Sequence, residues 1–139
     1  MTDHTDPLAA LPGYALRRAA NAMMAELAGR LGEIELRVSD ATVLLLVGER
    51  CDMTSSEIGK VLEIQRANMV PLLSRLERAG VIERKPIDRK SQAIVLTSAG
   101  VDALARVRDI TGQFEQDLLD RIPAAHRAHF VPALQALIG

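Results

Sequence analysis

Basic side chains gather in one short part of a chain whose formal net charge is −1. Arg84, Lys85, Arg89 and Lys90 fill four of seven consecutive positions, and residues 60–92 as a whole carry eight bases against four acids. That stretch has a net charge of +4, and the remainder of the chain sums to −5. Cationic side chains bind phosphate or carboxylate groups, so a basic region on an acidic body indicates a surface directed at a specific polyanion. The alternative is a solvated face of mixed charge.

The residue types that catalyse reactions or hold metal ions are not arranged to do so. The sequence has no phosphate-cradling glycine loop, no Ser/His/Asp arrangement and no recognisable pair of catalytic carboxylates. His126 and His129 lie three positions apart, but a metal site needs more convergent ligands. Cys51 is the only cysteine and is either a turn thiol or a redox switch. We therefore expect no enzymatic activity, no metal and no cofactor.

The basic stretch falls on a predicted β-hairpin. The segments VIERKPI (81–87) and AIVLT (93–97) are short, rich in β-branched residues and separated by a polar turn that contains Asp88. Pro86 fits an edge strand, because it cannot donate a hydrogen bond to a neighbouring strand.

Two short helices are predicted before the hairpin. Thr54 and Glu57 have the capping-box spacing that begins a helix at SEIGKVL, and a second helix runs through QRANMVPLLSRLER to a stop at Gly80. Pro71 removes one hydrogen bond from that helix, so we expect a mild kink. Two tightly joined helices followed by a basic hairpin describe a winged helix-turn-helix. In this arrangement the second helix fits the roughly 12 Å major groove of DNA.

Longer helices flank this unit. Apolar residues at helical spacing follow an expected loose start at residues 1–7, and Ser39 is expected to cap a buried helix over DATVLLLVGER. After the hairpin, a helix of some 24 residues begins at Thr97 or Ser98, and Pro123 separates it from a last helix. The predicted fold class is mainly α (α+β winged helix), with about six helices and a two-stranded β-wing.

Three motifs run through the helix pair and the hairpin: RLERAGVIER (75–84), DRK (88–90) and LTSAG (96–100). With them the chain resembles the MarR (multiple-antibiotic-resistance regulator) family. The resemblance extends more weakly to the first and last predicted helices. It implies one domain over 1–139, in which a winged helix-turn-helix DNA-binding lobe (39–97) joins a helical dimerisation region (8–38 and 98–139).

The resemblance implies a homodimer that binds a pseudo-palindromic operator in double-stranded DNA. Such a protein is a transcriptional regulator, most often a repressor that a small anionic or phenolic effector releases. The residues that would hold the effector are unknown. The resemblance assigns DNA binding to residues of both helices and the wing: Thr54, Ser55, Ser56, Gln65, Arg66, Ala67, Asn68, Ser74, Arg75, Arg84, Lys85, Arg89 and Lys90.

Several of these roles have alternatives. Arg66 could pair with guanine or phosphate and Asn68 with adenine or phosphate, although Gln65 and Asn68 could instead cap the helix. The amides at Thr54 to Ser56 could hold a phosphate or serve only as a cap. Ser74 and Arg75 are expected to meet phosphate.

Arg75 could also brace the wing by pairing with Asp88 or Glu77. Asp88 is expected to form an ion pair that braces the wing, because a free carboxylate would repel DNA. Family members generally place arginine where this chain has Lys90, so Lys90 would read the minor groove less selectively or Arg89 would replace it.

Two other functions stay open at this point: a winged-helix protein-interaction module, and a thiol redox-responsive regulator that uses Cys51. In hydroperoxide-sensing relatives the reactive cysteine lies in the first helix, where this chain has Leu11, Pro12 and Gly13. No apolar run approaches the roughly 20 residues that span a bilayer, and MTDHTDP lacks the layout of a signal peptide. We expect a cytoplasmic protein with no membrane partner.

Overall fold

The computed structural model describes residues 6–139; most of the expected loose start lies outside them. Its elements are α1 (Pro12–Gly32), α2 (Val38–Glu49), α3 (Ser55–Leu62), α4 (Arg66–Arg78), β1 (Ile82–Pro86), β2 (Gln92–Leu96), α5 (Ser98–Arg121) and α6 (Ala124–Ile138). The strands pair as an antiparallel hairpin. Within the described residues this confirms the expected fold class: mainly helical, with six helices and a two-stranded sheet.

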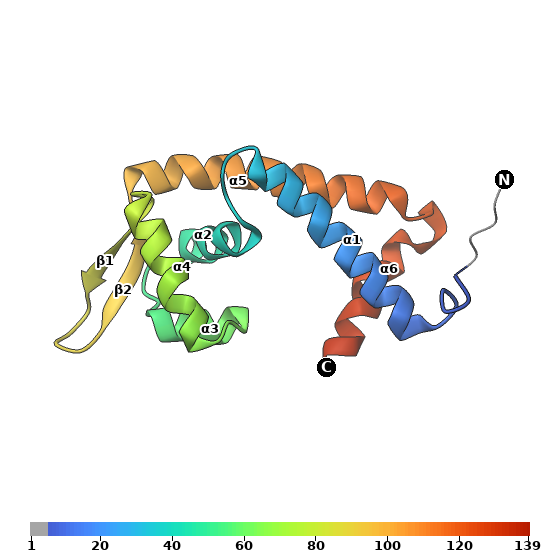
Figure 1. Cartoon of the computed structure of the whole chain (residues 1–139), viewed down its shortest axis with the longest axis horizontal. Helices are drawn as coiled ribbons and strands as arrows, with labels where there is room; N and C mark the ends of the chain where they lie inside the picture. Colours follow the sequence, from blue (N-terminus) through green and yellow to red (C-terminus); the bar gives the residue numbers. More distant parts are fainter. Residues whose placement is uncertain (1–5) are drawn as a thin grey trace.

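The long helix α5 runs along the whole molecule (Figure 1). The hairpin, α2, α3 and α4 gather below one end of it, and α1 and α6 extend toward the other end. The buried apolar core lies mostly in the first group, whereas α1 contributes only Leu31 to it and α6 has no buried residue. None of the described helices is both long and apolar enough to cross a membrane.

The helix pair forms as its local sequence predicts. The Thr54 hydroxyl accepts a hydrogen bond from the Glu57 backbone amide at 3.2 Å, which confirms the capping contact. Glu63 turns the chain between α3 and α4 with a left-handed backbone (φ 56°), and Gly80 ends α4 in the same region (φ 77°). Pro71 does not interrupt α4, which continues to Arg78.

The LTSAG motif joins the hairpin to α5. The Thr97 hydroxyl donates to the Gly80 carbonyl oxygen at 2.5 Å and accepts from the Gly100 amide at 3.0 Å. The Thr97 amide donates to the carbonyl oxygen of Val81 at 3.1 Å. A side chain at Gly100 would collide with that same carbonyl, so only glycine permits this approach. The base of the wing is therefore fastened at one point to both α4 and α5.

The start of α2 differs from the prediction. Ser39 lies inside the first turn and does not cap it, because the helix begins at Val38. The Asp40 carboxylate instead accepts the Arg37 backbone amide at 2.8 Å. Asp40 is only 3% exposed and is the one charged residue within the buried part of the described structure.

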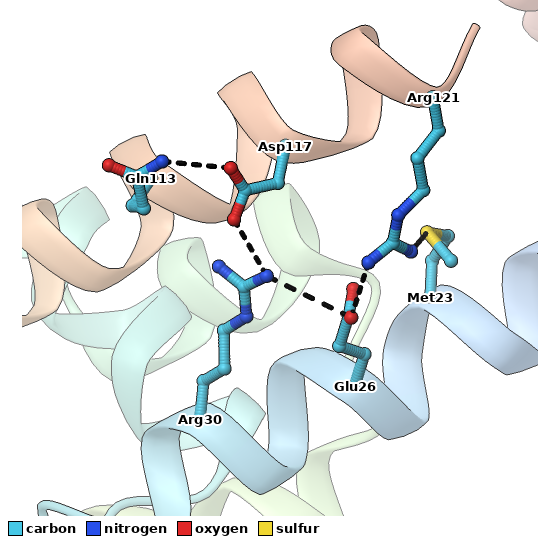
Figure 2. A network of polar contacts seen from close by, with 6 residues as sticks. All are labelled: Met23, Glu26, Arg30, Gln113, Asp117 and Arg121. Carbon is cyan, nitrogen blue, oxygen red and sulfur yellow. Dashed lines mark hydrogen bonds and ion pairs between the residues drawn. The ribbon is translucent and has the colours of Figure 1, made fainter.

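A network of ion pairs fastens α1 to α5 (Figure 2). Arg30 of α1 pairs with Asp117 of α5 at 2.8 Å, and Arg121 of α5 pairs with Glu26 of α1 at 2.6 Å. Gln113 donates a hydrogen bond to the second oxygen of Asp117 at 2.8 Å. These contacts set the direction in which α1 leaves the lobe.

Acidification is expected to loosen this contact. The pKa of Asp117 lies below its ordinary value because Gln113 and Arg30 donate hydrogen bonds to the carboxylate, and a hydrogen bond from Arg121 lowers the pKa of Glu26. A carboxyl group with a lowered folded-state pKa adds stability above its ordinary pKa of about 4 and loses it as the pH falls through the lowered value. The urea midpoint of the natural chain should therefore fall more steeply below about pH 4 than that of a Glu26→Gln, Asp117→Asn variant. Parallel curves would contradict the role of the network.

Candidate nucleic-acid interface

A hollow of about 820 Å³ opens between α3, the start of α4 and the hairpin. Its lining unites residues from three segments of the predicted site: Thr54, Ser55, Ser56, Arg66, Arg84, Asp88, Arg89 and Lys90. We call this hollow the wing groove. The chain thus brings together, in space, basic and hydroxyl side chains that are up to 36 positions apart in sequence.

The remaining predicted residues lie outside the wing groove. Gln65, Ala67 and Asn68 are exposed around the first turn of α4, and Ser74 is half-buried farther along the same helix. Lys85 lies on the other face of the wing, because neighbouring strand residues point to opposite faces and Arg84 and Pro86 both line the groove. A phosphate contact from Lys85 would have to come from that other face.

Arg84 links the wing to α4. Its Nε pairs with Glu77 Oε1 at 2.8 Å while its side chain lines the wing groove. The sequence left open a pairing of Glu77 with Arg75, but in the structure Arg84 is the arginine that pairs with Glu77. Arg84 therefore holds the wing at a set distance from α4.

Arg75 pairs inside the lobe instead. Its Nη2 lies 2.5 Å from Oδ1 of Asp40, whose side chain is 4% exposed, and its own side chain is 32% exposed. The Nε of Arg75 is buried and has no hydrogen-bond partner among the described residues. The alternative in which Arg75 pairs with Asp88 or Glu77 is therefore wrong. Arg75 ties α4 to the start of α2, which leaves less of its charge for phosphate.

Asp88 shapes the tip of the wing through the backbone. Its Oδ1 accepts the amides of Lys90 at 2.8 Å and Ser91 at 2.9 Å, and the Ile87 amide donates to the Ser91 carbonyl at 2.9 Å. No cation of the described chain lies within 4 Å of the carboxylate, so the expected ion pair is absent there. The turn that Asp88 closes presents Arg89 and Lys90 at its end.

Four cations of the wing groove are left without a carboxylate partner within 4 Å in the described structure: Lys60, Arg66, Arg89 and Lys90. Sequence reasoning omitted Lys60 and Gln92 from the site, although both line the groove. Lys60 follows Ser56 by four positions, which places both on one face of α3, and Gln92 lies opposite Pro86 in the hairpin register. These two spacings could have identified them.

A second hollow, of about 460 Å³, lies between α1, α2 and α5. Its lining is mostly apolar and includes Met24, Leu27 and Leu31, with Arg108 and Glu115 as its charged members. Arg108 Nη2 also pairs with Glu49 at 3.1 Å. Since it joins the winged lobe to α1, this hollow is the candidate for a small-molecule pocket.

The remaining candidates form no site. Cys51 is exposed in the bend after α2 and lines neither hollow, and His126 and His129 are exposed on α6. Among residues 6–139 no group of three His, Cys, Asp or Glu side chains is placed to hold a metal ion.

Comparison with known proteins identifies the unit that carries the wing groove. Residues 36–91 match the model of the MarR family, a span that includes every predicted site residue. Residues 36–91 are therefore a MarR-family segment. The chain is 34% identical over 89 residues to the HTH-type transcriptional regulator PecS of Dickeya dadantii, covering 63% of this chain and 51% of PecS.

Two further comparisons also find transcriptional regulators. The chain is 27% identical over 97 residues to a putative transcriptional regulatory protein for the hcr operon of Thauera aromatica, covering 68% of this chain and 58% of that protein. It spans a little over half the length of these two curated relatives. It also superposes on the transcriptional repressor CouR bound to a 23-mer DNA duplex with a TM-score of 0.82, 29% identity and 94% coverage of both chains.

Proposed function

We propose that this chain is a dimeric MarR-family transcriptional regulator that binds double-stranded DNA sequence-specifically and represses transcription until a small molecule releases it. The observation that carries the proposal is the wing groove, where four cations that have no acidic partner among residues 6–139 face one hollow. Unpaired cations around a hollow between a helix and a wing fit the phosphates of a duplex, which supply most of the binding free energy in such complexes.

Each part of the lobe has a separate task in this proposal. The exposed first turn of α4, with Gln65, Arg66 and Asn68, enters the major groove and reads base edges. The start of α3 directs the amides of Ser55 and Ser56 at a phosphate. Arg89 and Lys90 at the wing tip reach the adjacent minor groove. Residues 39–97 thus form the DNA-binding lobe, and the duplex bound to CouR supports this reading by analogy.

The terminal helices, residues 8–38 and 98–139, form the dimerisation region of the proposed protein. They expose apolar side chains that a partner subunit would cover: Leu8, Leu11, Leu16, Val131, Leu137 and Ile138. A twofold dimer would place two recognition helices roughly 34 to 36 Å apart, one turn of DNA, and would therefore select a pseudo-palindrome.

The second hollow is the proposed effector site. Its apolar lining and the Arg108 guanidinium suit a small anionic or phenolic compound, and its place between α1, α2 and α5 joins the two regions. We also infer that the protein works in the cytoplasm and is not an enzyme, as expected for a regulator. The protein-interaction and Cys51 redox alternatives have no comparable cluster of residues in their support.

Selection of duplexes from a random-sequence pool tests this proposal. The full chain should enrich an inverted repeat whose half-sites are about 10 base pairs apart, and the complex should have the mass of two chains and one duplex. Failure to enrich any sequence, with the chain remaining monomeric, would overturn it.

A further inference from the structure

Three exposed apolar residues lie on the outward face of the first half of α4. Ala67, Val70 and Pro71 are all exposed, and Val70 is 63% exposed. Val70 and Pro71 lie three and four positions after Ala67, so the three form one stripe on the helix. The stripe lies opposite the side that Met69 and Leu72 bury in the core. An apolar stripe is unexpected on a helix that would read base edges with hydrogen bonds.

The charge at the start of the stripe indicates what covers it. Arg66 directly precedes Ala67 and lines the wing groove, where Lys60, Arg89 and Lys90 also lie without a carboxylate partner within 4 Å among residues 6–139. An apolar stripe that begins beside a cationic groove is complementary to a polyanion that also displays apolar groups. Duplex DNA is such a partner, because each thymine carries a C5-methyl group in the major groove.

We propose that Ala67, Val70 and Pro71 read thymine methyl groups in the operator. The inference rests on the proposed DNA-binding function and adds its sequence preference. The polar residues of the first turn read donors and acceptors at one end of each half-site, and the stripe contacts T·A pairs farther along. Because no guanidinium or amide projects from this stripe, a bidentate contact to guanine is not available there.

Removal of the methyl group alone tests the proposal. A duplex enriched by the full chain is remade with uracil in place of single thymines, which keeps every hydrogen-bonding group of the base pair. At thymines that the stripe contacts, affinity should fall about fourfold per methyl group and about sixteenfold when both symmetry-related thymines are changed. Thymines outside the half-sites should show no effect.

A substitution in the stripe tests whether the loss of affinity caused by uracil arises there. In Val70→Ala the loss caused by uracil should shrink toward none at one thymine of each half-site. Val101→Ala is the matched control, because Val101 is also a helical valine, is 57% exposed and lies in α5 outside the wing groove. The Val101→Ala variant should lose as much affinity on uracil substitution as the natural chain does.

The outcomes separate the inference from the function on which it rests. Sequence-specific binding that uracil does not weaken, or an equal uracil effect in Val70→Ala and the natural chain, would overturn methyl reading and leave DNA binding intact. If no duplex is enriched and the chain instead captures a protein through α4, both proposals fall.

Discussion

Replacement of Arg89 and Lys90 together by alanine is expected to lower the affinity for operator DNA by about 10²- to 10³-fold near physiological salt. Both side chains stand at the tip of the wing, on a turn that Asp88 closes, without an acidic partner within 4 Å in the described structure. A dimer would lose four cations. Since each phosphate contact contributes about −0.9 to the slope of log affinity against log salt, that slope should flatten by about 3 to 4.

Lys85→Ala is the matched control for this double variant. It removes a cation of the same wing from the face turned away from the wing groove, where Lys85 approaches Glu83 at 3.9 Å. Its affinity and salt slope should stay near those of the natural chain. Filter binding or fluorescence anisotropy over a salt series would measure both. If Lys85→Ala and the double variant lose affinity equally per charge removed, the groove has no special role.

Asp40→Ala is expected to destabilise the fold by about 3 kcal/mol, because removal of one partner from a buried ion pair leaves the other charge uncompensated. Asp40 is 3% exposed and accepts both Arg75 Nη2 and the Arg37 amide that begins α2. The expected loss of stability lies near the lower end of the range for broken buried ion pairs, because the Arg75 side chain is 32% exposed and retains some hydration. The free energy of unfolding from urea titration measures it.

Asp52→Ala provides the comparison. Asp52 also pairs with an arginine, Arg50 at 3.4 Å, but both side chains are more than half exposed. Exposed pairs contribute about 0 to 1 kcal/mol, so this variant should unfold near the midpoint of the natural chain. Similar losses in the two variants would show that burial does not determine the importance of the Asp40 pair.

Local signals predicted the helix pair and the hairpin well. Thr54 caps α3 through Glu57, three residues away, and Gly80 ends α4 with a positive φ, so a few neighbouring residues determine both features. The β-branched segments around Asp88 form the two strands for the same reason. The fold class follows from such elements in order.

Contacts between distant residues were not predictable in this way. Arg75 and Asp40 are 35 positions apart, and nothing in their spacing distinguishes Asp40 from Asp88 as a partner. Arg84 reaches Glu77 only because the hairpin folds back onto α4. The contact by which Asp40, and not Ser39, caps α2 is local, since it joins residues three positions apart, and the sequence prediction missed it. Electrostatic partners are decided by packing, which periodicity does not describe.

The salt dependence of DNA binding tests the central claim most directly. The affinity of the natural chain for an inverted repeat from its own upstream region is compared with its affinity for a scrambled duplex of equal length, between 50 and about 200 mM salt. We predict binding of the repeat at least about 10³-fold tighter than of the scrambled duplex, with affinity falling steeply as salt rises. Equal affinity for the two duplexes that does not change with salt would contradict the proposal that the wing groove binds operator DNA.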